Sequence, residues 1–197
     1  MWQEKTVSFG NKPAAGATIV AMWSQSGIRW AHAALLFGVC GAASSQLVHF
    51  DWGTWVLPIP FGVLAAWLFA EGALPRVLLV ALTWAVWLGA YRTGLVMGSE
   101  GGSLRKLLAM CLAGLIGGFG VTVATAIARR TTPSPGGLVA VAAAGTICGL
   151  PFAAWLIAGN ESRIPDWAQM LVSFTVWQGA VGFGLWRSFG TAASETA

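Results

Sequence analysis

Charged residues are scarce in this sequence. Aspartate, glutamate, lysine and arginine make up 9% of the 197 residues, whereas about a quarter is usual for a soluble domain. The few charges lie between long apolar stretches, hydrophobic residues make up 56% of the chain, and the mean hydropathy is +0.70. Several stretches reach the length of about 20 residues with which an α-helix crosses a bilayer. The sequence therefore predicts an all-α, polytopic integral membrane protein with no sizeable soluble domain.

Residue types that hold metals and cofactors are also few. The chain has two histidines and three cysteines, and Cys40, Cys111 and Cys148 all fall inside apolar stretches. Buried thiols behave as small hydrophobic groups, and the sequence contains no Cys-x-x-Cys pair. We therefore expect no bound metal and no other cofactor.

Sequence signals of catalysis and of nucleic-acid binding are missing as well. The chain has no glycine-rich phosphate loop with a lysine, no His-Glu motif of a metal hydrolase and no Gly-x-Ser-x-Gly. No nucleophile and base fall at similar depth in the apolar stretches, so we name no catalytic residue and favour a function other than catalysis. The net charge of +4 comes from basic residues at the ends of apolar stretches, and we expect no nucleic-acid partner.

Six apolar stretches predict six transmembrane helices. They cover approximately residues 30–48, 53–70, 77–97, 107–128, 138–158 and 167–186. We expect one transmembrane domain over residues 28–187, after a polar, interfacial segment over 1–27 and before a loose tail over 188–197. Three prolines lie inside the second and fifth stretches, and each removes a backbone donor that neighbouring groups must replace in lipid. We therefore expect kinks at Pro58, Pro60 and Pro151.

The distribution of basic residues predicts an orientation. With both termini in the cytoplasm, seven lysines and arginines fall on the inner side of the membrane and four on the outer side. This excess follows the positive-inside rule. We expect a location in the bacterial inner membrane, with both termini cytoplasmic. Arg105 and Lys106 fall on the outer side and depart from the rule.

Two segments of the chain are similar to each other. Residues 65–90 open with Ala-Ala-Trp-Leu and close with Val-Trp-Leu-Gly-Ala, and residues 153–180 open with Ala-Ala-Trp-Leu and close with Val-Trp-Gln-Gly-Ala. The spacing from proline to tryptophan is twelve residues in both, from Pro75 to Trp87 and from Pro165 to Trp177. The similarity predicts two halves, residues 28–97 and 104–187. Because each half has an odd number of helices, the repeat would be inverted in the membrane.

Arg92 is the one guanidinium well inside a predicted span. A charge near the middle of a bilayer costs about 2.5–3.5 kcal/mol on insertion scales, so it is retained there where it faces a cavity or a partner. An arginine near the end of a span instead extends its side chain to the headgroups. Both interpretations remain open. In the first, Arg92 faces a cavity and pairs with Glu100, with Asp166 or with an anionic solute.

Four tryptophans and one glutamine are further candidates for contact with a solute. Trp67 and Trp155 are equivalent in the two segments, as are Trp87 and Trp177, and all four lie deeper in their predicted spans than the tryptophans that mark the membrane interfaces. Their ring N–H groups need partners at that depth, so they either pack in the interior or frame a central cavity. Gln178 replaces the leucine of the first segment. It forms either an interhelical hydrogen bond or a solute contact.

Glycines at four-residue spacing mark the fourth and fifth spans. Gly114 and Gly118 form one Gly-x-x-x-Gly pattern, and Gly145 and Gly149 form another. Small residues let helix backbones approach closely where lipid gives no hydrophobic drive. These glycines predict helix packing, with a close-packed pore wall as the alternative.

Two functions fit this sequence. The first is a small membrane channel or carrier for a small solute. Arg92 would favour an anionic solute. The second is a non-transporting membrane subunit that scaffolds, assembles or regulates a larger complex, which the scarcity of intramembrane polar groups favours. Both functions require the lipid bilayer as a partner. We also expect a second copy of the chain or another membrane protein to bind.

Overall fold

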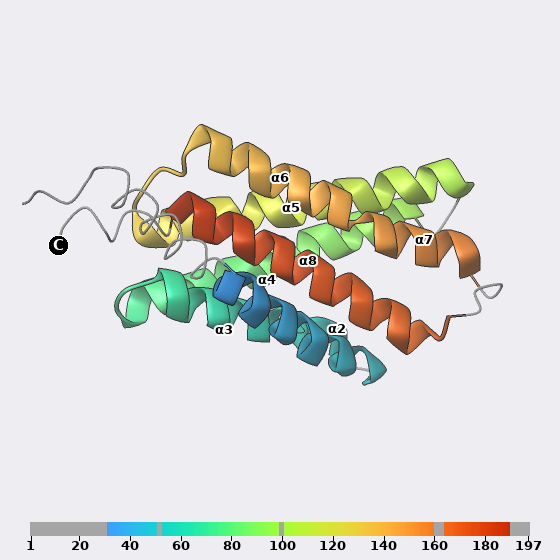
Figure 1. The fold of residues 1–197 in the computed structure, drawn as a ribbon, viewed down its shortest axis with the longest axis horizontal. Helices are drawn as coiled ribbons and strands as arrows, with labels where there is room; N and C mark the ends of the chain where they lie inside the picture. Colours follow the sequence, from blue (N-terminus) through green and yellow to red (C-terminus); the bar gives the residue numbers. More distant parts are fainter. Residues whose placement is uncertain (1–30, 51–52, 99–100, 160–163, 190–197) are drawn as a thin grey trace, which may run out of the picture.

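The fold is a bundle of helices. The computed structural model describes residues 31–50, 53–98, 101–159 and 164–189, and within these ranges it contains helices and no strand. Figure 1 shows the longer helices running along the long axis of the molecule. The prediction of an all-α chain is confirmed. The predicted segment 1–27 lies outside the described residues, and so does the predicted tail 188–197 except for residues 188 and 189, which belong to the last helix.

Helices occupy all six of the predicted stretches. The first described helix covers Ala31–Ser45 and leads into a short 3-10 helix, η1 (Gln46–His49). The remaining helices, in chain order, are α2 (Gly53–Val56), α3 (Pro58–Phe69), α4 (Ala73–Gly98), α5 (Ser103–Arg129), α6 (Pro135–Cys148), α7 (Leu150–Ala158) and α8 (Asp166–Phe189).

Three helical stretches of the described chain are long and apolar enough to cross a membrane. They are α4, α5 and the stretch Pro135–Ala158, which combines α6 and α7. Ala31–Ser45 and Gly53–Phe69 are apolar but shorter. Large hydrophobic side chains cover the outside of the bundle, among them Leu74 at 75% exposure and Val96 at 69%. An apolar exterior of this extent fits lipid rather than water.

Prolines interrupt two of the helical stretches. Pro58 begins α3 directly after a turn at Leu57, and Pro151 lies in the first turn of α7 after a break at Gly149. A proline at the first turn of a helix costs little, because its missing N–H has no intrahelical partner there. The carbonyls of the preceding helix lose their donors, however, and one of them takes a side-chain donor from another helix.

Helix α5 lies at the centre of the bundle, where it contacts α3, α4, α6, α7 and α8. Its glycines bring it against α6 at backbone distance. A Cβ added at Gly118 would lie 2.6 Å from the carbonyl oxygen of Val141, and one at Gly114 would overlap the carbonyl of Gly145. No side chain larger than hydrogen fits at these points.

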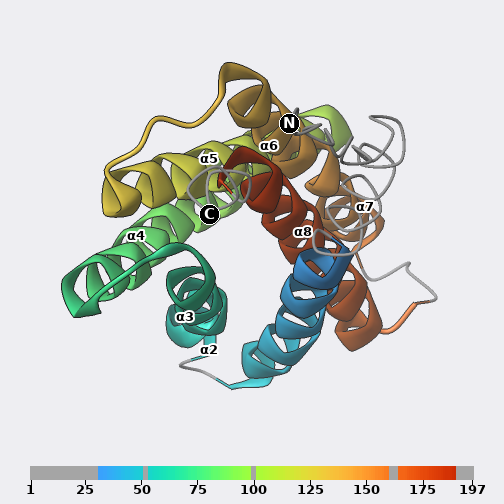
Figure 2. The ribbon, with the colours of Figure 1, turned by 60° about the vertical axis from the view of Figure 1, so that its left-hand side comes forward.

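The first described helix packs on α8 in a similar way. A Cβ added at Gly41 would lie 2.7 Å from the carbonyl carbon of Phe174, and one at Gly182 would overlap the ring of Phe37. Figure 2 shows this helix, in blue, beside α8, while α3 and α4 lie together on another side. The arrangement leaves α4 and α8 facing each other across the interior.

Three basic side chains bind the carbonyl ends of helices other than their own. Arg76 Nε donates to Ala70 O at 3.1 Å, Lys106 Nζ to Leu156 O at 2.9 Å, and Arg129 Nη1 to the O of Phe189 at 3.0 Å. Cations at helix C-termini satisfy orphan carbonyls and interact favourably with the helix dipole. Lys106 therefore has a structural use on its side of the membrane, whatever the positive-inside rule would prefer.

Candidate functional site

A cavity of about 260 Å³ lies inside the bundle between α2, α3, α4, α5, α7 and α8. Its lining includes Thr83, Gly117 and Gln178, each near the middle of its own helix. The lining also reaches Leu95, which is exposed. The cavity thus extends from the middle of the bundle toward the end at which α4 finishes and α5 begins.

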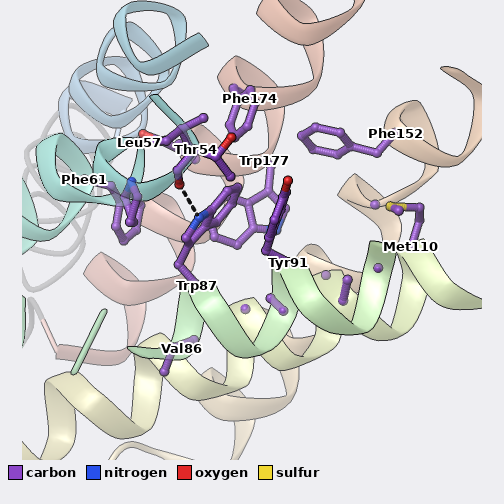
Figure 3. Close-up of a pocket in the computed structure, with 18 of the residues that line it drawn as sticks. Thr54, Leu57, Phe61, Val86, Trp87, Tyr91, Met110, Phe152, Phe174 and Trp177 are labelled. Atoms are coloured by element: carbon purple, nitrogen blue, oxygen red, sulfur yellow. Dashed lines mark hydrogen bonds between the residues drawn. The ribbon is translucent and has the colours of Figure 1, made fainter. Parts of the chain in front are cut away.

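Seven aromatic residues contribute to its walls. Trp87 and Tyr91, one turn apart on α4, stack with ring centroids 5.9 Å apart, and Trp87 also contacts Phe174 of α8 at 5.8 Å. Phe152 of α7 meets Phe174 edge to face at 5.1 Å. Figure 3 shows the rings of Trp87, Tyr91 and Trp177 gathered around one space. Flat rings of this kind stack against planar solutes.

The position of Trp87 depends on a proline in another helix. Pro58 has no N–H, so the Thr54 carbonyl four residues earlier receives no helical hydrogen bond from it. The indole N–H of Trp87 donates to that carbonyl at 3.2 Å, as the dashed line in Figure 3 shows. Nearby, the indole of Trp84 donates to Trp55 O at 2.8 Å. These two bonds fix α2 on α4 and hold one wall of the cavity.

Trp177 enters the cavity wall because α5 has glycine opposite it. A Cβ added at Gly117 would lie 2.6 Å from Cζ2 of the Trp177 ring. The other face of Trp177 approaches Phe61 of α3, with centroids 5.9 Å apart. A residue without a side chain therefore makes room for the largest one.

Two buried polar side chains on the lining each have an oxygen without a hydrogen-bond partner among the described residues. Gln178 is 1% exposed and Thr83 is 2% exposed. Neither Gln178 Oε1 nor Thr83 Oγ1 has a partner among the described residues. An unpaired buried polar atom costs about 1–3 kcal/mol. Both residues line the same cavity, so a polar occupant that reached the two atoms would remove that cost.

Beyond Phe61 the interior is filled. Phe37 lies 4.9 Å from Phe61, centroid to centroid, and 6.3 Å from Phe69, which in turn lies 6.4 Å from Phe189. All four rings are buried. We call Phe37, Phe61, Phe69 and Phe189 the aromatic plug. It closes the cavity toward the end at which α8 finishes.

The residues predicted as solute contacts divide between this cavity and the outside. Trp87, Trp155, Trp177 and Gln178 line the cavity. Trp155 Nε1 donates to Asp166 Oδ1 at 3.0 Å, and this carboxylate lies outside the lining.

Trp67 and Arg92 lie elsewhere. Trp67 is 65% exposed and lines an outer groove between α3 and α4 instead. Arg92 is exposed on α4 and does not belong to the lining. Neither residue contacts the cavity in this structure.

The four predicted packing glycines lie together where α5 meets α6 and the start of α7. Gly114 and Gly118 face Gly145 and Val141, and a Cβ at Gly149 would overlap the carbonyl of Met110. Gly114 and Gly149 also line the cavity, so the same close contact forms part of its wall.

The sequence analysis missed Tyr91 and Thr83 as cavity residues. A signal existed for Thr83, because it is the equivalent of Ser173 in the two similar segments and both are polar inside apolar spans. Tyr91 carried no such signal, since a tyrosine near the end of a span is also typical of the membrane interface.

No protein-family model matches the chain, and no curated protein or solved structure was found to be similar to it.

Proposed function

We propose that the chain is a small membrane carrier whose solute pathway passes through the cavity between α4 and α8. The observation that carries the proposal is that Gln178 and Thr83, two residues that line a mid-bundle cavity, each have a buried side-chain oxygen with no partner among the described residues. Buried polar groups without partners are rare where nothing binds them. Transporters commonly place their solute near the bilayer midplane between two halves of the fold.

In this proposal, the cavity has access from one side only, as a carrier needs in each of its states. It reaches the exposed Leu95 at one end, and the aromatic plug fills the interior at the other. With the six-span topology and cytoplasmic termini that the sequence predicts, the Leu95 end faces outside. The structure would then represent the outward-open state, and transport would require the plug to part.

Contacts between the helices support the inverted repeat as part of this proposal. Exchanging the two halves pairs Ala31–Ser45 with α5, and α4 with α8. The contact between Ala31–Ser45 and α8 then corresponds to the contact between α5 and α4, and both contacts are present. The equivalent residues Trp87 and Trp177 also both line the cavity. Trp67 and Trp155 have different surroundings, so the symmetry would be approximate.

Cysteine accessibility tests whether the cavity is a water-filled pathway. In a variant without Cys40, Cys111 and Cys148, Ala90→Cys places a thiol on the lining. Ala85→Cys places one on the exposed face of the same helix, which lipid would cover. A membrane-impermeant thiol reagent applied from the Leu95 side should modify Ala90→Cys and spare Ala85→Cys. Equal, background-level labelling of the two thiols would contradict a carrier.

A non-transporting subunit is the second candidate, and one surface favours it. The outer groove between α3 and α4 is lined by Trp67 and Trp84 with Val63, Val77 and Val80. Two tryptophans on an apolar outer face are typical of a contact with another membrane protein. Purification from native membranes separates the candidates, because a subunit would bring a stoichiometric partner and Trp67→Ala would release it.

A further inference from the structure

We infer that the solute is an uncharged, flat heteroaromatic molecule that carries a carboxamide-like edge with both a donor and an acceptor. The inference rests on the proposed function and names the class of solute for the same cavity. Three features of the lining carry it. These are its lack of charge, the planar walls and the chemistry of Gln178.

The residues that line the cavity disfavour a charged solute. Among the described residues that line the cavity there is no lysine, arginine, aspartate, glutamate or histidine. Arg92 is exposed outside it, and Asp166 bonds the far side of Trp155. A charged solute would be buried without a counter-ion, which is far more costly than burying a neutral polar group. The cavity therefore selects against an anion, although Arg92 made an anion attractive from the sequence.

The walls favour a flat molecule of about two fused rings. A cavity of about 150 Å³ lined by apolar side chains holds benzene, so a cavity of 260 Å³ has room for a further ring. Trp87 and Tyr91 stack on each other with an interplanar angle of 22°, so a planar solute would stack on an outer face of this pair. Stacking on such faces stabilises a planar solute and gives little to a branched aliphatic one.

The side-chain amide of Gln178 determines which hydrogen-bonding groups the solute needs. A glutamine side chain offers a carbonyl acceptor and an amide donor, and its Oε1 has no partner among the described residues. A carboxamide edge on the solute complements it, because each amide donates to the carbonyl of the other. Thr83 Oγ1 adds a hydroxyl that accepts or donates as required. A solute without a donor would leave Gln178 Oε1 buried and unpaired.

Three compounds with one ring system separate these requirements. Quinoline-3-carboxamide has both donor and acceptor, 3-acetylquinoline lacks the donor, and quinoline-3-carboxylate carries a negative charge. Binding is measured by equilibrium dialysis against the full chain in lipid nanodiscs, with empty nanodiscs as the partition control. We expect the carboxamide to bind about tenfold more tightly than the ketone. We expect the carboxylate to bind about a hundredfold more weakly than the carboxamide.

Gln178→Met keeps the length of the side chain and removes the amide. It should lower the affinity for quinoline-3-carboxamide more than the affinity for 3-acetylquinoline, because the carboxamide loses two hydrogen bonds and the ketone loses only the one that Gln178 Nε2 donates. The binding of the ketone that remains also shows that the variant is folded. Thr175→Val removes a hydroxyl from the same helix outside the cavity lining and should change neither affinity. Equal binding of carboxamide and ketone by the native chain would overturn the inference, and so would a preference for the carboxylate or a parallel loss of both neutral compounds in Gln178→Met.

Failure of this inference and failure of the proposed function give different results. If Ala90→Cys is accessible but the neutral quinolines fail to bind, the pathway stands and the solute class is wrong. If the quinolines bind as expected and Ala90→Cys stays unreactive, the cavity is a binding site that does not conduct a solute. The second result contradicts the carrier alone.

Discussion

The indole N–H of Trp87 donates to the backbone carbonyl of Thr54, the carbonyl that Pro58 leaves without a helical donor. In the hydrocarbon core of a bilayer, such a carbonyl takes its donor from a neighbouring helix or from water in a cavity, and here a neighbouring helix supplies it. The donor that a proline removes from one predicted span is thus replaced by the indole N–H of a tryptophan in the next. The bond also fixes the orientation of a ring in the cavity wall.

A double-mutant cycle tests this relationship. Trp87→Phe should lower the free energy of unfolding by about 1 kcal/mol, because Thr54 O loses its donor. In a Pro58→Ala background the loss should shrink, since alanine supplies the N–H that proline lacks. Trp84→Phe is the control, because Trp55 O is not the carbonyl that Pro58 deprives. The effects of Trp84→Phe and Pro58→Ala on the free energy of unfolding should therefore add. If the effects of Trp87→Phe and Pro58→Ala also add, the account is contradicted.

Gly117 makes room for the ring of Trp177, and a methyl group there should disturb the cavity. Gly117→Ala would push Cζ2 of Trp177 away from α5 and into the space for the solute. Overpacking of this kind costs about 1–3 kcal/mol, so binding of quinoline-3-carboxamide should weaken by about tenfold or more. Gly89→Ala meets no atom within 4 Å and should bind normally. Unchanged binding by Gly117→Ala would show that the ring moves freely.

The contact between α5 and α6 rests on backbone rather than on flexible side chains. A methyl group at Gly114 would overlap the carbonyl of Gly145, and neither helix can yield locally. Gly114→Ala should therefore lower stability by about 2 kcal/mol, measured by thermal unfolding in detergent. Gly136→Ala has open space around its Cβ and should be neutral or slightly stabilising. Equal melting temperatures for the two variants would argue against the close contact.

Lys106 binds the carbonyl end of α7, and its neighbour offers a matched control. Lys106→Met should reduce stability by about 0.5–1 kcal/mol, because the bond to Leu156 O and the favourable charge at the helix end are both lost. Arg105 is exposed, and Arg105→Met should change stability less. If the two substitutions are equivalent, the basic pair serves topology alone.

The orientation of the bundle is open to direct labelling. In a variant without native cysteines, Ser103→Cys should react with an impermeant reagent outside the cell, and Thr132→Cys should react only after permeabilisation. Both positions are exposed; Ser103 is the first residue of α5, and Thr132 follows its end. The reverse pattern would invert the predicted topology and place Arg105 and Lys106 in the cytoplasm, as the positive-inside rule prefers.

The positions of the helices along the chain could largely be predicted from the sequence. The six apolar stretches all contain helices, and the breaks lie at Pro58 and beside Pro151. Proline acts locally, so its effect is readable from sequence. Gly114 and Gly118 were equally readable, because a close helix contact needs small residues at that spacing.

Which face of a helix looks inward was harder to predict. Lipid is as apolar as leucine, so burial in a membrane bundle leaves little hydrophobic contrast between the inner and outer faces. Trp67 and Trp155 have equivalent places in the two similar segments, yet Trp67 faces outward and Trp155 lines the cavity. Arg92 was singled out for its depth along α4, but depth does not determine the direction in which a side chain points.

The central claim is that a solute passes through the cavity, and labelling of Ala90→Cys from each side of sealed vesicles tests it most directly. The account predicts fast labelling from the Leu95 side and slower labelling from the other side, because the aromatic plug must open for access. Phe61→Ala shortens the plug next to the cavity and should speed labelling from the closed side alone. Labelling from the Leu95 side only, with no change in Phe61→Ala, would contradict the claim and leave a pocket that opens in one direction.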